Sequence, residues 1–175
     1  MEKKYISGIG IYDLVPHDKE IVGLEIGVDM GVTADFMLDN LPMLTLHGID
    51  PYLEYLDWNG SYLNQPHRNW CETIAINMLS QYEDRYILHK QLSDDAAATF
   101  QDDSFDYIFI DGLHTYEQVL KDCKNFYGKL KPGGVFAGHD YRTIEGVRKA
   151  VDEFAAKVGA AISETDNDVW YWIKK

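Results

Sequence analysis

The sequence has few cysteines, few positive charges and no long hydrophobic run. Its two cysteines, Cys71 and Cys123, form no CxxC pair, which excludes a disulfide framework. We expect both as reduced thiols of a cytoplasmic protein. No apolar run reaches about 18 residues, and no charged segment followed by an apolar one opens the chain. We therefore predict a protein that is neither secreted nor inserted in a membrane.

Positive charge is scarce, because 16 lysines and arginines stand against 29 acids and give a net charge of −13. Such a surface repels phosphate backbones and disfavours a nucleic-acid substrate. We assign the lysines between positions 121 and 131 to a solvated helix face. The length of 175 residues predicts a single domain, residues 1–175, with no separate recognition domain. A small-molecule acceptor is therefore favoured over a protein partner.

Short apolar runs alternate with helical patterns, which is typical of βαβ units and a mostly parallel sheet. We expect strands at positions 21–26, 45–49, 85–89, 105–110, 135–138, 161–164 and 169–173. We expect helices at about 33–41, 72–81, 116–130 and 144–158, with a short one capped by Ser93. The stretch KPGG at 131–134 should end the third of the longer helices. The short turn TDND predicts a final hairpin, so that the last strand is antiparallel.

A glycine-bearing turn, in GLEIGVDMGVT, follows the first expected strand. Gly27 and Gly31 would let the backbone approach a ligand, although on their own they serve equally well for a tight turn. The spacing is not G-x-G-x-x-G, and Asp29 opposes a pyrophosphate, which argues against NAD; no P-loop occurs either. Asp50 ends the second strand and is placed to accept hydrogen bonds from the hydroxyls of a ribose. Glu25 precedes the turn and can face a positively charged group of the ligand. The pattern predicts a nucleoside site with positive attachments.

Two pairs of an acid and a histidine follow the fourth and fifth strands. They are Asp111 with His114 in FIDGLHTYEQ, and His139 with Asp140 in AGHDY. Because adjacent parallel strands end at one edge, the pairs should converge. Asp111, Asp140 and His139 are candidate ligands of Mg²⁺, and the lack of a thiolate argues against zinc. His114 remains as the candidate general base.

Two other interpretations of these pairs stay open. Asp111 could simply cap the following helix. His139 could be a core histidine, since successive strand residues face opposite sides of a sheet and His139 and Asp140 converge only if the strand has ended.

The segments EIGVDMGVT, GIDPY, IDGLHTYEQVLKD and LKPGGVFAGHDY resemble class I S-adenosylmethionine-dependent methyltransferases. They are most similar to a small branch with the signature DGxHxY, PGG and HDY. The resemblance covers about residues 20–175 and implies one α/β, Rossmann-like, doubly wound sheet in the order 3-2-1-4-5-7-6. The branch is similar to metal-dependent O-methyltransferases of catechols, sugars and natural products. A sulfonium is positive, which agrees with acids in the first turn.

The resemblance also implies a role for each candidate residue. The residues implied to bind the cofactor S-adenosylmethionine are Glu25, Gly27 and Gly31 at its methionine end, Asp50 at the ribose, Ser93 and Asp94 at the adenine, and Asp111. The residues implied to bind Mg²⁺ are Asp111, Asp140 and His139. His114 stands at the position of the catalytic base, with Asp111 beside it. Related enzymes carry an acid at position 139, so the histidine weakens the case for strict metal dependence.

The acceptor would be held by residues 52–71, which we expect to form a lid rich in tyrosine and tryptophan, and by an N-terminal segment at 1–19. The same residues could instead form a contact in a homodimer or a small hydrophobic cluster. We predict a methyltransferase that methylates a hydroxyl of a small sugar-like or natural-product-like acceptor, with or without Mg²⁺.

Two alternatives to this prediction remain. One is methyl transfer without a metal and with His114 as the base. The other is a noncatalytic nucleoside-binding module of the same fold, against which the set of Asp111, His114 and Asp140 argues.

Overall fold

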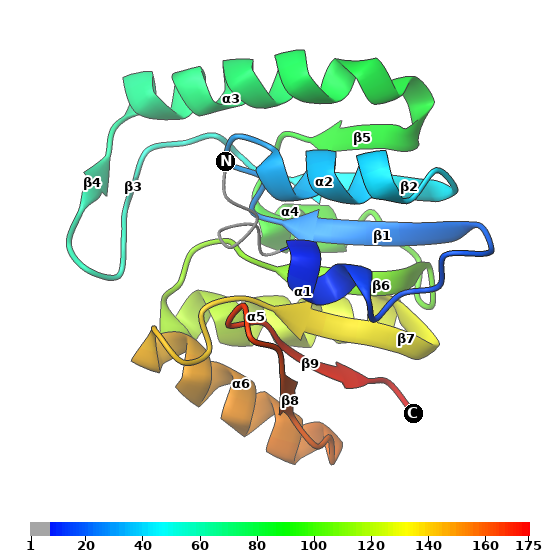
Figure 1. Ribbon diagram of the computed structural model, residues 1–175. Helices are drawn as coiled ribbons and strands as arrows, with labels where there is room; N and C mark the ends of the chain where they lie inside the picture. Colours follow the sequence, from blue (N-terminus) through cyan, green and yellow to red (C-terminus); the bar gives the residue numbers. More distant parts are fainter. Residues whose placement is uncertain (1–7) are drawn as a thin grey trace.

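The computed structural model describes residues 8–175, which form one mixed seven-stranded sheet with helices on both faces (Figure 1). Its strands are β1 (Ile21–Ile26), β2 (Leu44–Ile49), β5 (Tyr86–His89), β6 (Phe105–Ile110), β7 (Leu130–Gly138), β8 (Ser163–Glu164) and β9 (Trp170–Ile173). A separate hairpin consists of β3 (Tyr55–Leu56) and β4 (Tyr62–Leu63). The helices are α1 (Gly8–Tyr12), α2 (Val32–Asn40), α3 (Gln65–Leu79), α4 (Ser93–Ala97), α5 (Tyr116–Phe126) and α6 (Glu145–Val158), with 3₁₀ turns at Ser80–Arg85 and Tyr127–Lys129.

The strand order is β5-β2-β1-β6-β7-β9-β8, which confirms the predicted order. The strands from β5 to β7 are parallel, and β9 is antiparallel to β7 and to β8, as the turn TDND predicts. In Figure 1 the arrows of β1, β5 and β7 point to the left, toward the hairpin of β3 and β4. After β1 the chain adds β2 and β5 on one side of it, and then crosses over to add β6 and β7 on the other side. This change of direction opens a crevice beyond the carboxyl ends of β1 and β6.

Two hydrophobic cores hold the central strands. Along β6, Tyr107 and Phe109 pack in the core with residues of α1, α2 and α3, whereas Ile108 and Ile110 pack in the core with residues of α4, α5 and α6. This alternation follows from the two-residue period of a strand, and burial on both faces explains the nearly continuous apolar sequence. The site residues that follow β1 and β6 are therefore anchored on rigid backbone.

The structure corrects three local predictions. Helix α3 begins at Gln65 rather than at Glu72, because Asn64 accepts a hydrogen bond from the amide of His67 as N-cap and Pro66 occupies the first turn. Strand β7 begins at Leu130, so KPGG is part of the strand; the amide of Gly133 donates to the carbonyl of Lys174. Ser93 does not cap α4, because its N-cap is Leu92.

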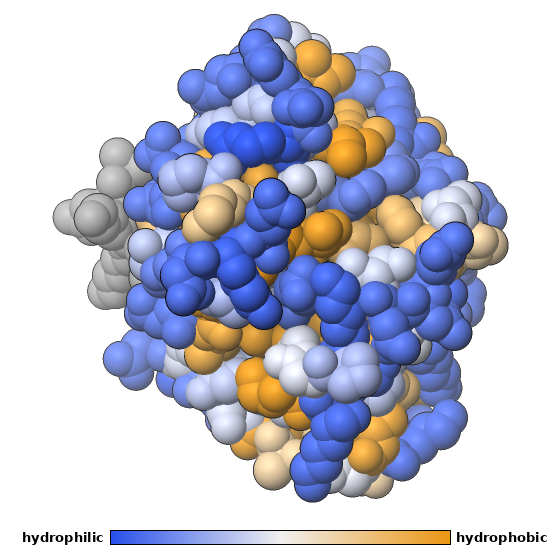
Figure 2. Space-filling model, turned by 90° about the vertical axis from the view of Figure 1, so that its right-hand side faces the viewer, coloured by the Kyte–Doolittle hydropathy of each residue, from blue (hydrophilic) through white to orange (hydrophobic). Residues whose placement is uncertain are grey.

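No helix within residues 8–175 is long and apolar enough to cross a membrane. Figure 2 shows the face of the molecule opposite the hairpin, where hydrophilic side chains predominate and apolar ones are scattered. Of the N-terminal segment 1–19 that we predict to contact the substrate, residues 1–7 lie outside the described part of the chain.

Candidate active site

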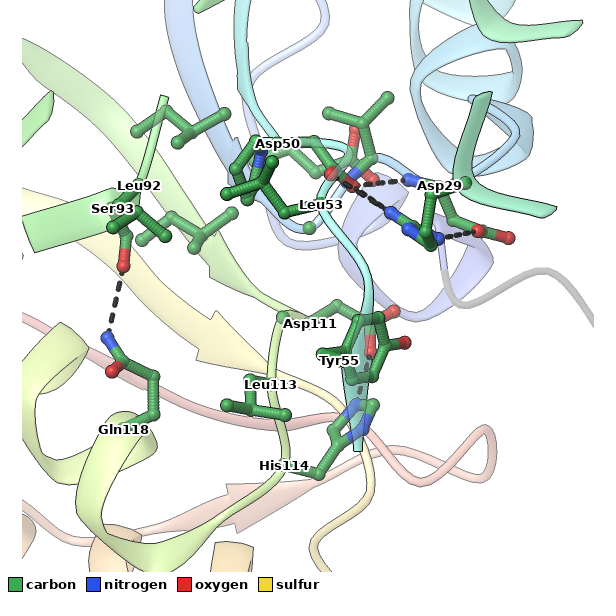
Figure 3. Close-up of a pocket in the computed structure, with 18 of the residues that line it drawn as sticks. Asp29, Asp50, Leu53, Tyr55, Leu92, Ser93, Asp111, Leu113, His114 and Gln118 are labelled. Carbon is green, nitrogen blue, oxygen red and sulfur yellow. Dashed lines mark hydrogen bonds and ion pairs between the residues drawn. The ribbon is translucent and has the colours of Figure 1, made fainter. Parts of the chain in front are cut away.

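A cavity of about 580 Å³ lies at the carboxyl ends of β1, β2 and β6. The predicted site residues that line it are Glu25, Gly27, Asp50, Ser93, Asp94, Asp111 and His114, whereas Gly31, His139 and Asp140 are not among its lining residues. In Figure 3 Ser93 and Gln118 lie on one side of this space, Asp29 and Asp50 on another, and Asp111 and His114 near its lower edge. Carboxylates therefore surround the cavity from several elements.

The two glycines of the first turn serve the backbone. Gly27 has φ of +92°, and a Cβ there would lie 2.1 Å from the carbonyl oxygen of Asp111. Gly31 has φ of +80°, and a Cβ there would lie 2.9 Å from Leu79 Cδ1 on α3. A larger residue at Gly27 would thus push the end of β1 away from the end of β6, and a larger residue at Gly31 would push the start of α2 away from α3. Only Gly27 also borders the cavity.

Glu25 is a buried acid among the residues that line the cavity. Within the described chain its Oε2 atom has no hydrogen-bond partner. Burial, and then the charges of Asp111 and Asp50, raise the pKa of Glu25 well above its ordinary value. A buried carboxyl oxygen without a donor is costly, and a cationic ligand group would satisfy it.

Asp50 is held by Arg68 of α3, which the sequence analysis did not single out. Its Oδ1 and Oδ2 atoms lie 2.9 and 3.0 Å from Arg68 Nη2. The same carboxylate accepts from the backbone amides of Val28, Asp29 and Tyr52 at 2.8–3.1 Å. Arg68 also donates to Asp29 at 2.7 Å. Asp50 thus borders the cavity at the predicted ribose position, but both of its oxygens are already engaged.

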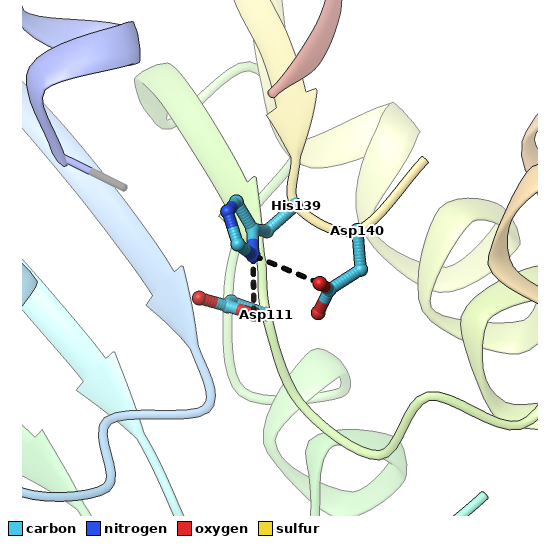
Figure 4. A group of neighbouring side chains, drawn as sticks. All are labelled: Asp111, His139 and Asp140. Atoms are coloured by element: carbon cyan, nitrogen blue, oxygen red, sulfur yellow. Dashed lines mark ion pairs between the residues drawn. The ribbon is translucent and has the colours of Figure 1, made fainter. Parts of the chain in front are cut away.

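The two predicted pairs converge. Ligand atoms of Asp111, His139 and Asp140 all lie within 4.8 Å of one another, as a metal site requires (Figure 4). Strand β7 ends at Gly138, and Asp140 has φ of +62°. This left-handed conformation turns Asp140 back toward Asp111, so that strand alternation no longer separates it from His139. The geometry confirms that the residues meet and leaves their ligand role a prediction.

One ring nitrogen of His139 contacts the backbone and the other faces two carboxylates. Its Nε2 atom lies 3.0 Å from the carbonyl oxygen of Asn167, so this nitrogen donates and carries a proton. The other nitrogen, Nδ1, lies 3.3 Å from Asp140 and 3.9 Å from Asp111. Burial lowers the pKa of His139, but the hydrogen bond to Asp140 and both carboxylate charges outweigh burial and raise the pKa to about 9. Either a proton or a cation must separate Nδ1 from these oxygens.

His114 lies between three carboxylates. Its Nε2 atom is 3.1 Å from Asp140 and 3.3 Å from Asp111, and its Nδ1 atom is 3.8 Å from Asp57. Burial lowers the pKa of His114, but the hydrogen bonds and charges of Asp111 and Asp140 raise it to about 10. The two carboxylates therefore favour the protonated form of His114.

Four site residues escaped sequence reasoning: Asp57, Arg68, Gln118 and Asp122. Asp57 lies between β3 and β4 and Arg68 lies near the start of α3, and both belong to a stretch of sequence where no periodicity indicates an orientation. The pattern NQP at 64–66 could have located the start of α3 and so placed Arg68 on its first turns. Asp122 is a buried acid next to the apolar stripe of α5, and a charged residue at such a position is itself a signal.

Comparison with known families decides the class of this protein. The family model described as "Methyltransferase domain" matches residues 24–141, about two thirds of the chain. The chain belongs to this family. It is a class I S-adenosylmethionine-dependent methyltransferase, and S-adenosylmethionine is the cofactor of such enzymes. Curated protein sequences contain no significant match to this methyltransferase.

Solved structures share the fold of the methyltransferase. The O-methyltransferase NovP is 21% identical, with a TM-score of 0.68 over 96% of this chain and 76% of that chain. A protein from Staphylococcus aureus described as a caffeoyl-CoA O-methyltransferase is 15% identical, with a TM-score of 0.60 over 89% and 76%. A protein from Methanococcus maripaludis described as an S-adenosylmethionine-dependent methyltransferase is 15% identical, with a TM-score of 0.60 over 90% and 78%. These likenesses establish the architecture.

Proposed function

We propose that this methyltransferase transfers a methyl group to a hydroxyl of a small acceptor, and that the cavity holds the cofactor with its amino group toward Glu25. The observation that carries the proposal is the buried Glu25, whose Oε2 atom has no hydrogen-bond partner within the described residues, in the lining of a cavity that several other carboxylates also line. S-adenosylmethionine has an ammonium and a sulfonium group and no phosphate. An acidic cavity favours such a ligand and disfavours a dinucleotide.

The other predicted cofactor contacts also border the cavity. Gly27, Asp111, Ser93 and Asp94 line it together with Glu25, and Figure 3 shows Ser93 on another side of the space from Asp111. A ribose would reach Asp50 only by sharing or displacing the hydrogen bonds of Arg68. Gly31 supports the turn from behind without lining the cavity.

His114 is the proposed general base, with Asp111 beside it. It borders the cavity, so an acceptor hydroxyl placed there would reach an imidazole nitrogen. To accept a proton, His114 must first lose the one that Asp111 and Asp140 stabilise. The hydroxyl oxygen and the transferred methyl must also be held about 3 Å apart and aligned, which is a task for the rigid ends of β1 and β6.

We propose Asp111, His139 and Asp140 as the residues that would hold a divalent cation. Their donor set of two carboxylates and an imidazole whose second nitrogen donates to a carbonyl fits such an ion. Mg²⁺ bound there would polarise an acceptor hydroxyl and offset the carboxylate charges that hold the proton on His114.

The hairpin and the start of α3 form the proposed acceptor side. Leu53, Tyr55, Leu63 and His67 line the cavity from this segment. Large apolar side chains remain exposed nearby, namely Leu56, Trp58, Tyr62 and Trp70. Apolar and aromatic surface beside the cavity suits a ring-bearing acceptor, and we propose residues 52–71 as the lid over it. A contact with a second copy in a homodimer would use the same side chains.

The test is calorimetric titration with S-adenosylhomocysteine, with and without Mg²⁺ and alongside NAD. We expect binding of the first in the micromolar range and none of NAD. We expect His114→Ala to keep this binding and to lose methyl transfer to hydroxylated acceptors. We expect Asp140→Asn to lose the heat of Mg²⁺ binding, while Asp39→Asn, the same change on the exposed side of α2, keeps it. A protein that binds no S-adenosylhomocysteine under any condition would refute the assignment.

Metal-independent transfer is the second candidate, favoured by the direct contacts between His114 and both carboxylates. In that case His139 and Asp140 have a structural role and bind no metal. Chelation of divalent cations would then leave turnover unchanged, and His114→Ala would still abolish it.

A further inference from the structure

The loop between β7 and α6, residues 139–144, is fastened to the turn of the C-terminal hairpin, residues 165–168. Arg142 makes several of these contacts. Its backbone amide and its Nε atom lie 2.7 and 3.4 Å from Asp168 Oδ1, and its Nη2 atom donates to two backbone carbonyl oxygens of the turn at 3.0 and 3.1 Å. Strand β9, which follows the turn, pairs with β7. The loop is therefore braced against the sheet through the hairpin.

Thr143, within this loop, contacts two carboxylates with one hydroxyl. Its Oγ1 atom lies 2.9 Å from Asp140 Oδ1 and 2.7 Å from Asp168 Oδ2. A threonine hydroxyl has one hydrogen, so it donates to only one of these oxygens at a time. Asp168 has further donors in Arg142, and the hydrogen can go to Asp140 without leaving Asp168 unpaired.

The contact with Thr143 bears on how the carboxylate of Asp140 is turned. Asp140 Oδ1 lies between Thr143 Oγ1 and His139 Nδ1, which is 3.3 Å away, while Oδ2 lies 3.1 Å from His114 Nε2. Figure 4 shows the same carboxylate directed toward His139. The last torsion of an aspartate is broad, so the backbone alone does not set the rotation of its two oxygens. A hydrogen bond to Oδ1 selects the rotation that presents Oδ2 to His114.

We propose that Thr143 is a positioning residue, which holds Asp140 in the orientation that the proposed divalent-cation site requires, with the turn 165–168 as its support. The inference rests on the proposed function, in which Asp111, His139 and Asp140 hold the cation. Hydrogen-bond partners of ligating carboxylates orient them, and losing such a partner typically costs about 10–100-fold in metal affinity. Among the described residues Thr143 is not part of the cavity lining, so its effect should be confined to the cation.

The experiment is calorimetric titration with Mg²⁺ alone, on protein saturated with S-adenosylhomocysteine and at one pH. We expect Thr143→Val, which keeps the branched shape and lacks the hydroxyl, to weaken Mg²⁺ binding by about tenfold or more. Thr143→Ser restores a hydroxyl and should restore most of the affinity. Thr73→Val is the matched control on α3, where the hydroxyl donates to the carbonyl oxygen of Asn69 at 2.8 Å, and should leave Mg²⁺ binding unchanged. No charge changes in any variant, so the comparison reports the hydrogen bond itself.

Two further readouts separate positioning from a general disturbance of the fold. Thr143 is exposed, so its variants should keep the urea midpoint and the affinity for S-adenosylhomocysteine. Equal Mg²⁺ affinity in Thr143→Val and the unaltered protein would overturn the role of Thr143 and leave the cation site standing. A loss that Thr143→Ser does not restore, or one that comes with weaker S-adenosylhomocysteine binding or a lower urea midpoint, would overturn it as well.

The same titrations distinguish this proposal from those beneath it. No heat of Mg²⁺ binding in the unaltered protein would overturn both the role of Thr143 and the cation site, while bound S-adenosylhomocysteine would leave the proposed methyl transfer intact. Absence of S-adenosylhomocysteine binding would refute the proposed function itself.

Discussion

Replacing Arg68 by methionine tests how the site is held together. Arg68 is buried on α3 and is the cation that pairs with Asp50, through contacts of 2.9 and 3.0 Å. Methionine keeps much of the side-chain length and removes the charge and all donors. The change therefore leaves a buried carboxylate at the end of β2 with its backbone hydrogen bonds alone.

The expected cost follows from the two partners of Arg68. Breaking a buried ion pair from one side typically costs about 3–5 kcal/mol. We expect about 3 kcal/mol here, because the amides of Val28, Asp29 and Tyr52 still donate to Asp50. The pairing with the half-exposed Asp29 side chain adds under about 1 kcal/mol. A loss of this size is a large share of the stability of a domain, about 5–15 kcal/mol.

The assay is urea denaturation followed by circular dichroism at neutral pH, on a double-mutant cycle of Arg68→Met and Asp50→Asn. The double variant should regain part of the loss, because no buried charge is left alone. Asp29→Asn is the matched control and should cost under about 1 kcal/mol. A cost below about 1 kcal/mol for Arg68→Met, or additive effects in the cycle, would contradict the buried pair described here.

Three further predictions concern the turn, the cavity and the far edge of the sheet. Gly27→Ala should destabilise the fold by about 2 kcal/mol more than Gly60→Ala. Both glycines have positive φ, but only at Gly27 would the added Cβ clash with a carbonyl oxygen. Urea denaturation measures the difference. Glu25→Gln should weaken S-adenosylmethionine and S-adenosylhomocysteine about equally, by about tenfold or more, because both carry the amino group; a loss confined to the sulfonium compound in calorimetry would place Glu25 elsewhere. His47 and His89 share a contact of 2.8 Å, and burial, with the charge of His89 acting on His47, lowers both pKa values. Their contribution to stability is thus complete above about pH 6.5 and is lost as pH falls below it. His89→Leu should flatten this slope in unfolding measurements between about pH 7.5 and 5.

The fold could be predicted from the sequence because its signals are local and repeated. Strand β6 is a continuous apolar run that ends in Asp111, and the apolar stripe of α5 follows it with a 3.6-residue period. The parallel order then follows from the alternation of strands and helices. The segment from Tyr52 to Asn64 resisted prediction, because its short hairpin lies outside the main sheet and its sequence shows no period.

The candidate site was predictable where the sheet itself positions residues. Asp111 and Asp140 follow neighbouring strands, and parallel pairing of β6 with β7 brings them together. Partners supplied by other elements were not predictable. Arg68 reaches Asp50 from α3, and nothing in the sequence links a residue on that helix to the end of β2. Gln118 and Asp122 meet Ser93 only because α4 packs against α5.

The placement of acids around the cavity carries a constraint on mechanism. Methyl transfer to an oxygen discharges the sulfonium, so an acid beside the sulfur would stabilise the reactant more than the transition state. An acid beside the amino group has no such effect, because that charge is unchanged by the reaction. Glu25 is buried at the end of β1, while Asp111, Asp140 and His114 gather where the acceptor hydroxyl would lie. The proposed arrangement therefore puts binding charge at the amino end and keeps the proton-handling groups at the oxygen end, which is the division that an efficient transfer requires.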